Sequence, residues 1–253
     1  MDPTTILLLG IVALLGGFID AIAGGGGMLV MPALLSIGMP PHLVVGTNKL
    51  VGTFGTLSAS VTFIRKGLFQ PALWWAMSFG TLVGALLGAV LIYLLSAGTL
   101  KTLLPLAILL ASGYLIWPRR TPSVQAMPRP EATPASRRGV KLLTGGLIGF
   151  YDGFIGPGTG AFWMAAAMKL FHLDLVAAAG VARFMNFVSN ITALLTFVIL
   201  GNIDYTVGLT MGATLMLGAF VGAHSAIRYG APFIRPVFLL VVALMAGRLL
   251  LAA

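Results

Sequence analysis

The 253 residues are 58% hydrophobic and only 8% charged, with a mean hydropathy of +1.03. Because a soluble domain carries roughly 25% charged residues, this composition excludes an ordinary soluble protein. Several apolar runs of about 20 residues predict an all-α integral membrane protein, since the short alternating segments of a transmembrane β-barrel are not found.

The net charge of +9 comes from 15 Lys and Arg against 6 Asp and Glu. Much of it lies in one loop, so the positive-inside rule explains it better than nucleic-acid binding. The chain has no cysteine, which excludes disulfides, thiolate metal sites and cysteine catalysis. The N-terminus has no basic region, so no cleavable signal peptide is expected.

The first transmembrane repeat is predicted over residues 1–117. Its segments are a span over 5–23, a short piece over 28–37, and spans over 43–64, 71–95 and 99–117. Four glycines, Gly24 to Gly27, interrupt the first apolar run, and glycine is a poor helix former. Unwound backbone at membrane depth persists only where protein or a water-filled cavity satisfies its polar groups. A helix starting at Met28 would point its free N–H groups into that cavity, which suits an anion.

A linker is predicted over residues 118–139, where five arginines and five prolines occur. A polar, proline-rich stretch of this kind stays extended and exposed to water. Its arginines place it in the cytoplasm by the positive-inside rule.

The second transmembrane repeat is predicted over residues 140–253. It has a leading span over 140–154, a break at Gly156-Pro157-Gly158-Thr159-Gly160, a short piece over 161–171, and spans over 175–200, 205–227 and 233–251. Asp20 and Asp152 are 132 positions apart, whereas 134 positions separate Lys49 from Arg183 and Lys101 from Arg235. Matched charges are improbable by chance in a chain this poor in charge, so two homologous halves are predicted, with about 8–10 transmembrane segments that include the broken helices.

The orientation of the halves follows from the loop charges. If each half crosses the membrane an even number of times, the halves are parallel and Arg228 and Arg235 lie outside. If each half crosses an odd number of times, the halves are inverted and more of the Lys and Arg residues lie in the cytoplasm. The inverted arrangement obeys the positive-inside rule better, although the short pieces make the crossing count awkward.

Lys49 and Arg183 are the first candidates for a substrate site, because each lies several residues inside an apolar span. A charge at that depth should face a cavity or a partner. Arg183 would then hold two oxygens of an anion, while Lys49 acts as a point charge. The alternatives are that each side chain snorkels to an interface or makes a structural ion pair.

Polar residues near these cations extend the candidate site. Asn186 and Asn190 share a helix face with Arg183, and amide and hydroxyl donors suit an oxyanion. Interhelical hydrogen bonding is the competing explanation. The full predicted set adds Thr47, Asn48, Ser189, Gly25, Gly26, Gly27, Gly158, Thr159 and Gly160.

Asp20 and Asp152 each precede a break by four residues. A carboxylate inside the membrane is a functional candidate by default and could couple transport to protons. The favoured interpretation is structural: each caps the broken backbone or pairs with Lys49 or Arg183. No metal site, cofactor or catalytic set is predicted, since the three histidines are scattered and no nucleophile–base spacing occurs.

The order of these motifs resembles the TauE/SafE family, the sulfite exporter-type permeases. Its first-half motifs resemble Gly17-x-x-Asp20-x-x-x-Gly24-Gly25-Gly26-Gly27 with Pro32, followed by Gly46-Thr47-Asn48-Lys49. The second-half motifs resemble Gly153-x-x-Gly156-Pro157-Gly158-Thr159-Gly160 and Arg183-x-x-Asn186-x-x-Ser189-Asn190. The resemblance implies transport of sulfur-containing anions such as sulfite or organosulfonates, often outward. Members differ in substrate, so the cargo is not fixed by the family.

The function expected is therefore a secondary transporter of a small anion in the cell membrane, not an enzyme, working by alternating access around a central cationic site. The first alternative is a passive anion channel. The second is a membrane protein without transport activity, either a scaffold or an enzyme subunit. The expected partners are the anionic substrate and the lipid bilayer, without nucleic acid, and a homodimer is left open.

Overall fold

The computed structural model describes residues 2–116, 138–230 and 233, which form helices and no strands. The first half contains α1 (Pro3–Ala23), α2 (Gly27–Ser36), α3 (Pro41–Arg65), the 3-10 helix η1 (Pro71–Trp74), α4 (Trp75–Tyr93) and α5 (Ala97–Ile116). The second half contains α6 (Arg138–Phe154), α7 (Thr159–Phe171), α8 (Leu175–Leu200) and α9 (Tyr205–Tyr229). The predicted all-helical class is confirmed. The predicted span over 233–251, and nearly all of the predicted linker over 118–139, lie outside the described residues.

Four helical stretches of the described part are long and apolar enough to cross a membrane: α1, η1 with α4, α8 and α9. Their outward faces carry large apolar side chains, such as Leu87 on α4 and Ile199 on α8. Shorter apolar helices, α2 among them, are too short for this by length alone. The composition and these helices identify a multi-pass integral membrane protein.

The helix ends follow local sequence signals. Pro3 and Pro41 open α1 and α3, where a missing N–H group is harmless. The side chain of Asp174 caps α8 by accepting from two backbone N–H groups, and Asp204 caps α9 by accepting from the N–H of Val207. Gly24 ends α1 in the left-handed conformation, which glycine adopts without steric cost. The sequence therefore sets both the length of the spans and the place of the first break.

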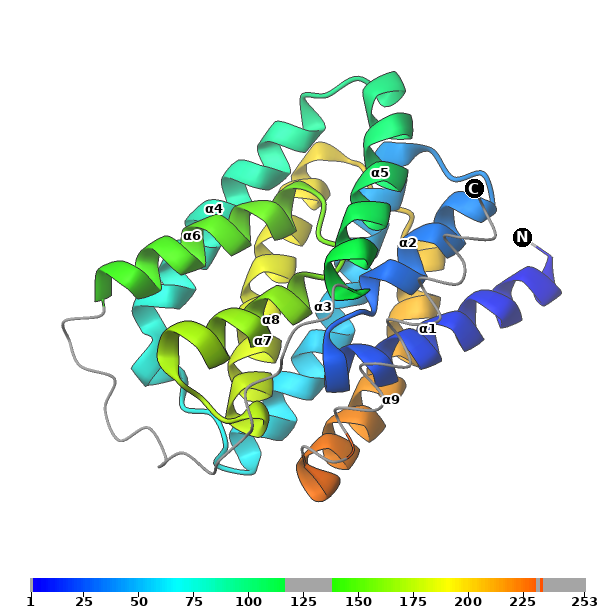
Figure 1. The fold of residues 1–253 in the computed structure, drawn as a ribbon. Coiled ribbons are helices and arrows are strands. Elements are labelled where there is room, and N and C mark those ends of the chain that lie inside the picture. The colour runs from blue at the N-terminus through cyan, green and yellow to red at the C-terminus, as the bar shows by residue number, and fades with distance from the viewer. Residues whose placement is uncertain (1, 117–137, 231–232, 234–253) are drawn as a thin grey trace.

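The helices form a central pair flanked by two outer pairs. In Figure 1, α3 and α8 lie in the middle, with α4 and α6 on one side and α1 and α9 on the other. The central pair is antiparallel: a Cβ built on Gly180, near the start of α8, would lie 3.2 Å from Phe63 near the end of α3. A Cβ on Gly46, near the start of α3, would overlap the carbonyl of Asn202, just after the end of α8.

The two outer pairs are built alike. A Cβ on Gly84 of α4 would overlap the carbonyl of Gly146 on α6, and a Cβ on Gly218 of α9 would overlap the carbonyl of Leu14 on α1. Each pair of backbones thus approaches too closely for any side chain, as the small-residue spacing predicts. Gly84 and Gly218 are 134 positions apart and Leu14 and Gly146 are 132 positions apart, which are the two offsets of the predicted repeat. The same contact is therefore made twice, each time between one helix of each half.

Candidate functional site

The first helix break lies between α1 and α2. Gly24 has φ +87°, and the backbone of Gly26 starts the next helix without any side-chain cap. The side chain of Asp20, in the last turn of α1, accepts from the N–H of Gly26 at 3.0 Å. This carboxylate therefore bridges the two ends of the interrupted helix, as the structural interpretation of Asp20 predicts.

The second break, between α6 and α7, has the same construction. Gly156 and Gly158 have φ +93° and +77°, and Gly158 is the uncapped start of α7. The Thr159 hydroxyl donates to the backbone oxygen of Gly156 at 2.5 Å and lies 3.2 Å from Asp152 Oδ1. Gly24 and Gly156 are 132 positions apart, as are Gly26 and Gly158, so both breaks occupy equivalent positions.

The two breaks touch each other. A Cβ on Gly160 would lie 2.6 Å from the Cα of Gly24, and a Cβ on Gly24 would overlap the backbone of Gly160 and Ala161. Only glycine allows this approach of two main chains. The interrupted segments of the two halves are thus brought face to face inside the protein.

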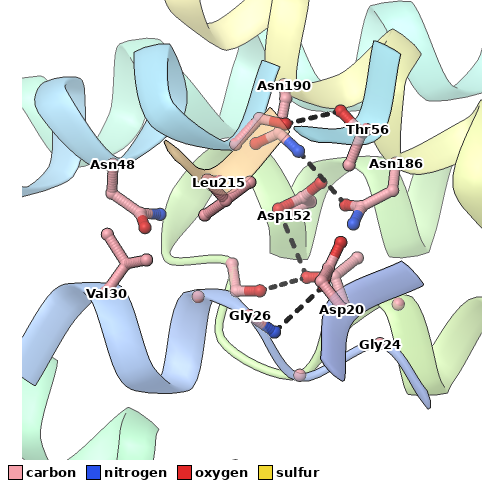
Figure 2. Close-up of a pocket in the computed structure, with 16 residues that line it drawn as sticks. Asp20, Gly24, Gly26, Val30, Asn48, Thr56, Asp152, Asn186, Asn190 and Leu215 are labelled. Carbon is pink, nitrogen blue, oxygen red and sulfur yellow. Dashed lines mark hydrogen bonds between the residues drawn. The ribbon is translucent and has the colours of Figure 1, made fainter. Parts of the chain in front are cut away.

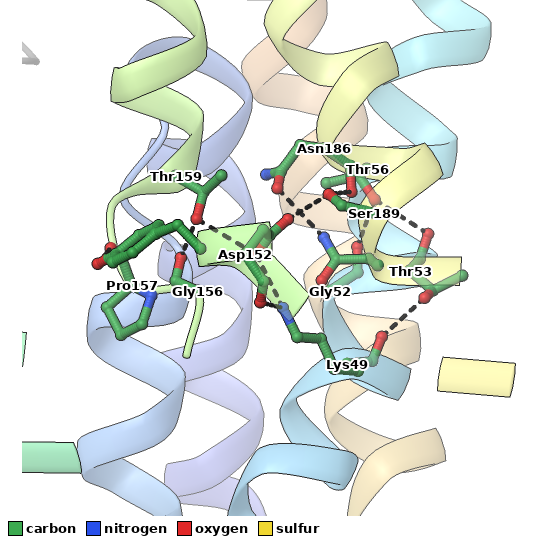
Figure 3. A network of polar contacts seen from close by, with 12 residues as sticks. Lys49, Gly52, Thr53, Thr56, Asp152, Gly156, Pro157, Thr159, Asn186 and Ser189 are labelled. Carbon is green, nitrogen blue, oxygen red and sulfur yellow. Dashed lines mark hydrogen bonds and ion pairs between the residues drawn. The ribbon is translucent and has the colours of Figure 1, made fainter. Parts of the chain in front are cut away.

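Lys49 forms an ion pair with the second break. Its ammonium lies 2.7 Å from Asp152 Oδ1 and also donates to the backbone carbonyl of Asp152 (Figure 3). Both side chains are buried, with exposed fractions of 1% and 3%. The carbonyl belongs to the last turn of α6, where backbone acceptors lack helical partners and the helix dipole is negative. Lys49 therefore neutralises both a carboxylate and a helix end.

Arg183 forms the equivalent ion pair with the first break. Its Nη1 lies 3.2 Å from Asp20 Oδ2 and also donates to the backbone carbonyl of Asp20, in the last turn of α1. The cation of each half is therefore paired with the carboxylate of the other half. Because an unpaired charge in the interior is strongly unfavourable, both pairs hold the halves together. Neither cation snorkels to an interface: Lys49 and Arg183 are both 0% exposed.

Between the breaks lies a small polar cavity (Figure 2). The centre of a water molecule can occupy about 30 Å³ of it, which exceeds the roughly 10–15 Å³ that one water needs. The lining is formed by Asp20, Gly24, Gly26, Gly27, Val30, Asn48, Gly52, Thr56, Asp152, Gly156, Gly158, Thr159, Gly160, Asn186, Asn190 and Leu215. These come from both breaks and from the middle of α3 and α8, so the cavity lies at mid-depth of the long helices.

Most of the predicted site residues line this cavity, but five do not: Thr47, Lys49, Arg183, Ser189 and Gly25. The two cations are turned toward the helix ends, where backbone carbonyls and carboxylates hold them. Ser189 lies behind the cavity and donates to Asp152 Oδ2. Thr47 accepts from the N–H of Asp204, at the start of α9, at 3.0 Å. These contacts are with the protein itself.

Several lining residues were missed by the sequence reasoning, and the repeat could have found two of them. Gly52 and Thr56 are 134 positions before Asn186 and Asn190, so they are the first-half equivalents of the two asparagines. A Cβ on Gly52 would lie 3.2 Å from the Asn190 amide oxygen, which shows why a small residue is needed there. Leu215, contributed by α9, has no polar signal that would have identified it.

Two broken helices, one from each half, that line a polar cavity among long apolar helices define a polytopic membrane transporter. The chain belongs to the family described as Sulfite exporter TauE/SafE, whose model matches residues 9–249. The resemblance seen in the motifs is thereby confirmed, and with it the expectation of a membrane transporter rather than an enzyme.

Relatives match over nearly the full chain. The "Probable membrane transporter protein YfcA" of Escherichia coli strain K12 is 37% identical over 250 residues, 96% of this chain and 90% of the relative. A "Probable membrane transporter protein" of Haemophilus influenzae is 37% identical over 238 residues, 94% of this chain and 91% of its own. "Probable membrane transporter protein ORF9" of a Sinorhizobium species is 38% identical over 240 residues, 95% of this chain and 90% of its own. No solved structure matches the chain.

Proposed function

We propose that this protein is a secondary transporter of the cell membrane that moves a small sulfur-containing anion, such as sulfite or an organosulfonate, by alternating access around the cavity between the two breaks. The observation that carries the proposal is that two helix starts, at Gly26 and Gly158, open on one polar cavity. The family description supports a sulfur oxyanion as cargo.

The cavity suits an anion for two physical reasons. The start of a helix presents backbone N–H groups and the positive end of the helix dipole, and here α2 and α7 both do so. Amide groups of Asn48, Asn186 and Asn190 add donors that can orient an oxyanion. The cavity is small in this structure, so a polyatomic anion would need the walls to part slightly.

Two carboxylates also line the cavity, and they bear on coupling. Asp20 and Asp152 are each balanced by one cation, so the four side chains together carry no net charge. Protonation of either aspartate would make the site positive and favour an anion. Proton-coupled binding at these two aspartates is therefore part of the proposal.

We further propose that the halves are inverted repeats. Support comes from the antiparallel α3 and α8, which are equivalent in the two halves, and from the partner exchange seen in both outer pairs and both ion pairs. An inverted pair of repeats supplies two equivalent sets of elements that can exchange arrangements, which exposes the cavity to each side in turn.

The experiment is uptake of labelled sulfite or an alkylsulfonate into liposomes that contain the purified protein. A carrier gives uptake that saturates with substrate concentration and that the unlabelled anion inhibits. Linear, unsaturable flux at rates above those of a carrier would indicate the channel instead. No flux of any anion tested, with protein that is folded and correctly inserted, would refute the proposal.

A further inference from the structure

We infer that an oxyanion docks on the unpaired edge of Arg183, in a subsite completed by Ser60 and Trp163, and that no such subsite exists beside Lys49. This inference rests on the proposed function, because it names the residues that bind the charged group of the substrate.

In the described part of the chain, the buried side-chain nitrogen and oxygen atoms without a hydrogen-bond partner are Ser60 Oγ, Trp163 Nε1, Arg183 Nε and Arg183 Nη2. A buried polar group without a partner typically lowers stability by about 1–3 kcal/mol, so native proteins keep few of them without a reason. Trp163 and Arg183 are both 0% exposed. Nη1 of Arg183 is engaged by Asp20, whereas the Nε–Nη2 edge is not.

That edge has the right geometry for an oxyanion. Nε–H and Nη2–H point to the same side of the planar guanidinium, where they match two oxygens of a carboxylate, sulfite or sulfonate. The edge also lies next to the cavity, because a Cβ on Gly160 would be 2.8 Å from Nη2 and Gly160 lines the cavity. Gly160 lies against Gly24, so an anion would reach the edge when the two breaks part.

The register of the helices places Ser60 and Trp163 at the Arg183 end of the site. Along the antiparallel pair, Gly52 lies opposite Asn190 and Phe63 lies opposite Gly180. Ser60 is on the same face of α3 as those two residues, so the register brings it opposite the turn of α8 that carries Arg183. Trp163 is one turn beyond Gly160 on α7, the helix whose start lies against the guanidinium. The unpaired atoms thus gather at one end of the site.

The unpaired nitrogens are all donors, and the Ser60 hydroxyl can donate as well. A species that satisfies them must therefore be an acceptor, which an oxyanion with two or more oxygens is. Beside Lys49 the equivalent positions are apolar: Met31 corresponds to Trp163, and Leu194 corresponds to Ser60. The Lys49 ammonium is already bound by the carboxylate and carbonyl of Asp152. The two halves therefore differ at these positions: the Arg183 side has unpaired donors, and the equivalent side chains beside Lys49 are apolar.

The test is thermal unfolding of the purified protein, titrated with sodium sulfite and sodium methanesulfonate against sodium chloride at equal ionic strength. A ligand that binds only the folded state raises the melting temperature with concentration, which gives a dissociation constant. Trp163→Phe removes one donor and keeps an aromatic ring, and Ser60→Ala removes another donor. We expect each to weaken anion binding roughly 10- to 100-fold, as expected for a lost hydrogen bond to a charged acceptor. Arg183→Lys, which keeps a charge for Asp20 but loses the two-nitrogen edge, should weaken binding more than tenfold.

Met31→Leu is the matched control, because it changes the position equivalent to Trp163 on the Lys49 side. It should bind the anion with the affinity of the wild type. If the wild type itself is not stabilised by either anion, the proposed function fails. If the wild type is stabilised and Trp163→Phe and Ser60→Ala bind as tightly as it does, then the donors hold only water and this inference is overturned, while the proposed function stands. If Trp163→Phe does not fold, Ser60→Ala and Arg183→Lys decide.

Discussion

Replacing Lys49 by Met should destabilise the protein strongly, because it leaves the Asp152 carboxylate buried without its charge partner. The Nζ–Oδ1 distance is 2.7 Å and both side chains are at most 3% exposed, so the ammonium is the buried counter-charge of this carboxylate. Removing one member of a buried pair typically costs about 3–5 kcal/mol. Ser189 still donates to the carboxylate, so we expect a loss near the lower end, on the order of 3 kcal/mol.

Thermal unfolding in detergent measures this loss. For a chain of this size, each kcal/mol shifts the melting temperature by roughly 2–4 °C, so a fall of about 6–12 °C is expected. Lys101→Met is the matched control, since Lys101 is exposed on α5, and its effect should stay within about 0.5 kcal/mol.

The double variant Lys49→Met with Asp152→Asn tests whether the unpaired Asp152 carboxylate causes the loss of stability. It removes both charges, so it should lose less stability than the two single variants together, by roughly 1–3 kcal/mol. Two single losses that simply add would mean that the charges do not interact. A Lys49→Met protein as stable as the Lys101→Met control would refute the account of this site.

Three further predictions follow from the fold and the site. Gly84→Ala should lower the melting temperature by several degrees, because its Cβ would overlap the Gly146 carbonyl, whereas Gly146→Ala should be tolerated, because its Cβ would meet no atom closer than 3.9 Å. Anion binding, measured by thermal shift, should be unchanged when sodium is replaced by potassium or choline. The reason is that Lys49 and Arg183 already occupy the helix ends where sodium-coupled transporters hold Na⁺. The chain has no native cysteine, so Lys66 and Asn202 can each be replaced by a single cysteine and labelled from either side of the membrane. Inverted halves require the two cysteines to react from opposite sides of the membrane. Labelling of both from the same side would contradict inverted halves.

The sequence was most informative about the helices and their interruptions. The predicted span over 175–200 matches α8, and the other described helices start and end within a few residues of their predicted bounds. The reason is that strong local signals mark these ends: Asp174 and Asp204 cap two helices, and Gly24 ends another. Such signals act within a few residues along the chain, so they are readable without knowledge of the fold.

The sequence did not predict which helix ends the side chains of Lys49 and Arg183 point to. The position of each cation inside an apolar span predicted that it faces either a cavity or a charged partner. The spacing of the residues along the sequence agreed with both alternatives. The decision depends on which helix end lies beside each cation, and that is set by contacts between residues such as Lys49 and Asp152, 103 positions apart. Gly52 and Thr56 were missed for a related reason, because their importance lies in the equivalence of the halves rather than in their own chemistry.

The crossed ion pairs constrain how the protein can move. If the two halves rocked against each other as intact units, Lys49 would leave Asp152 and Arg183 would leave Asp20, and each separation would strand buried charges. This is avoided if each break moves with the cation of the opposite half, so that α1 and α2 move with α8 while α6 and α7 move with α3. The contact between Gly24 and Gly160 is then the one that opens, and it is the contact beside the free edge of Arg183. Motion and anion access would thus depend on the same interface.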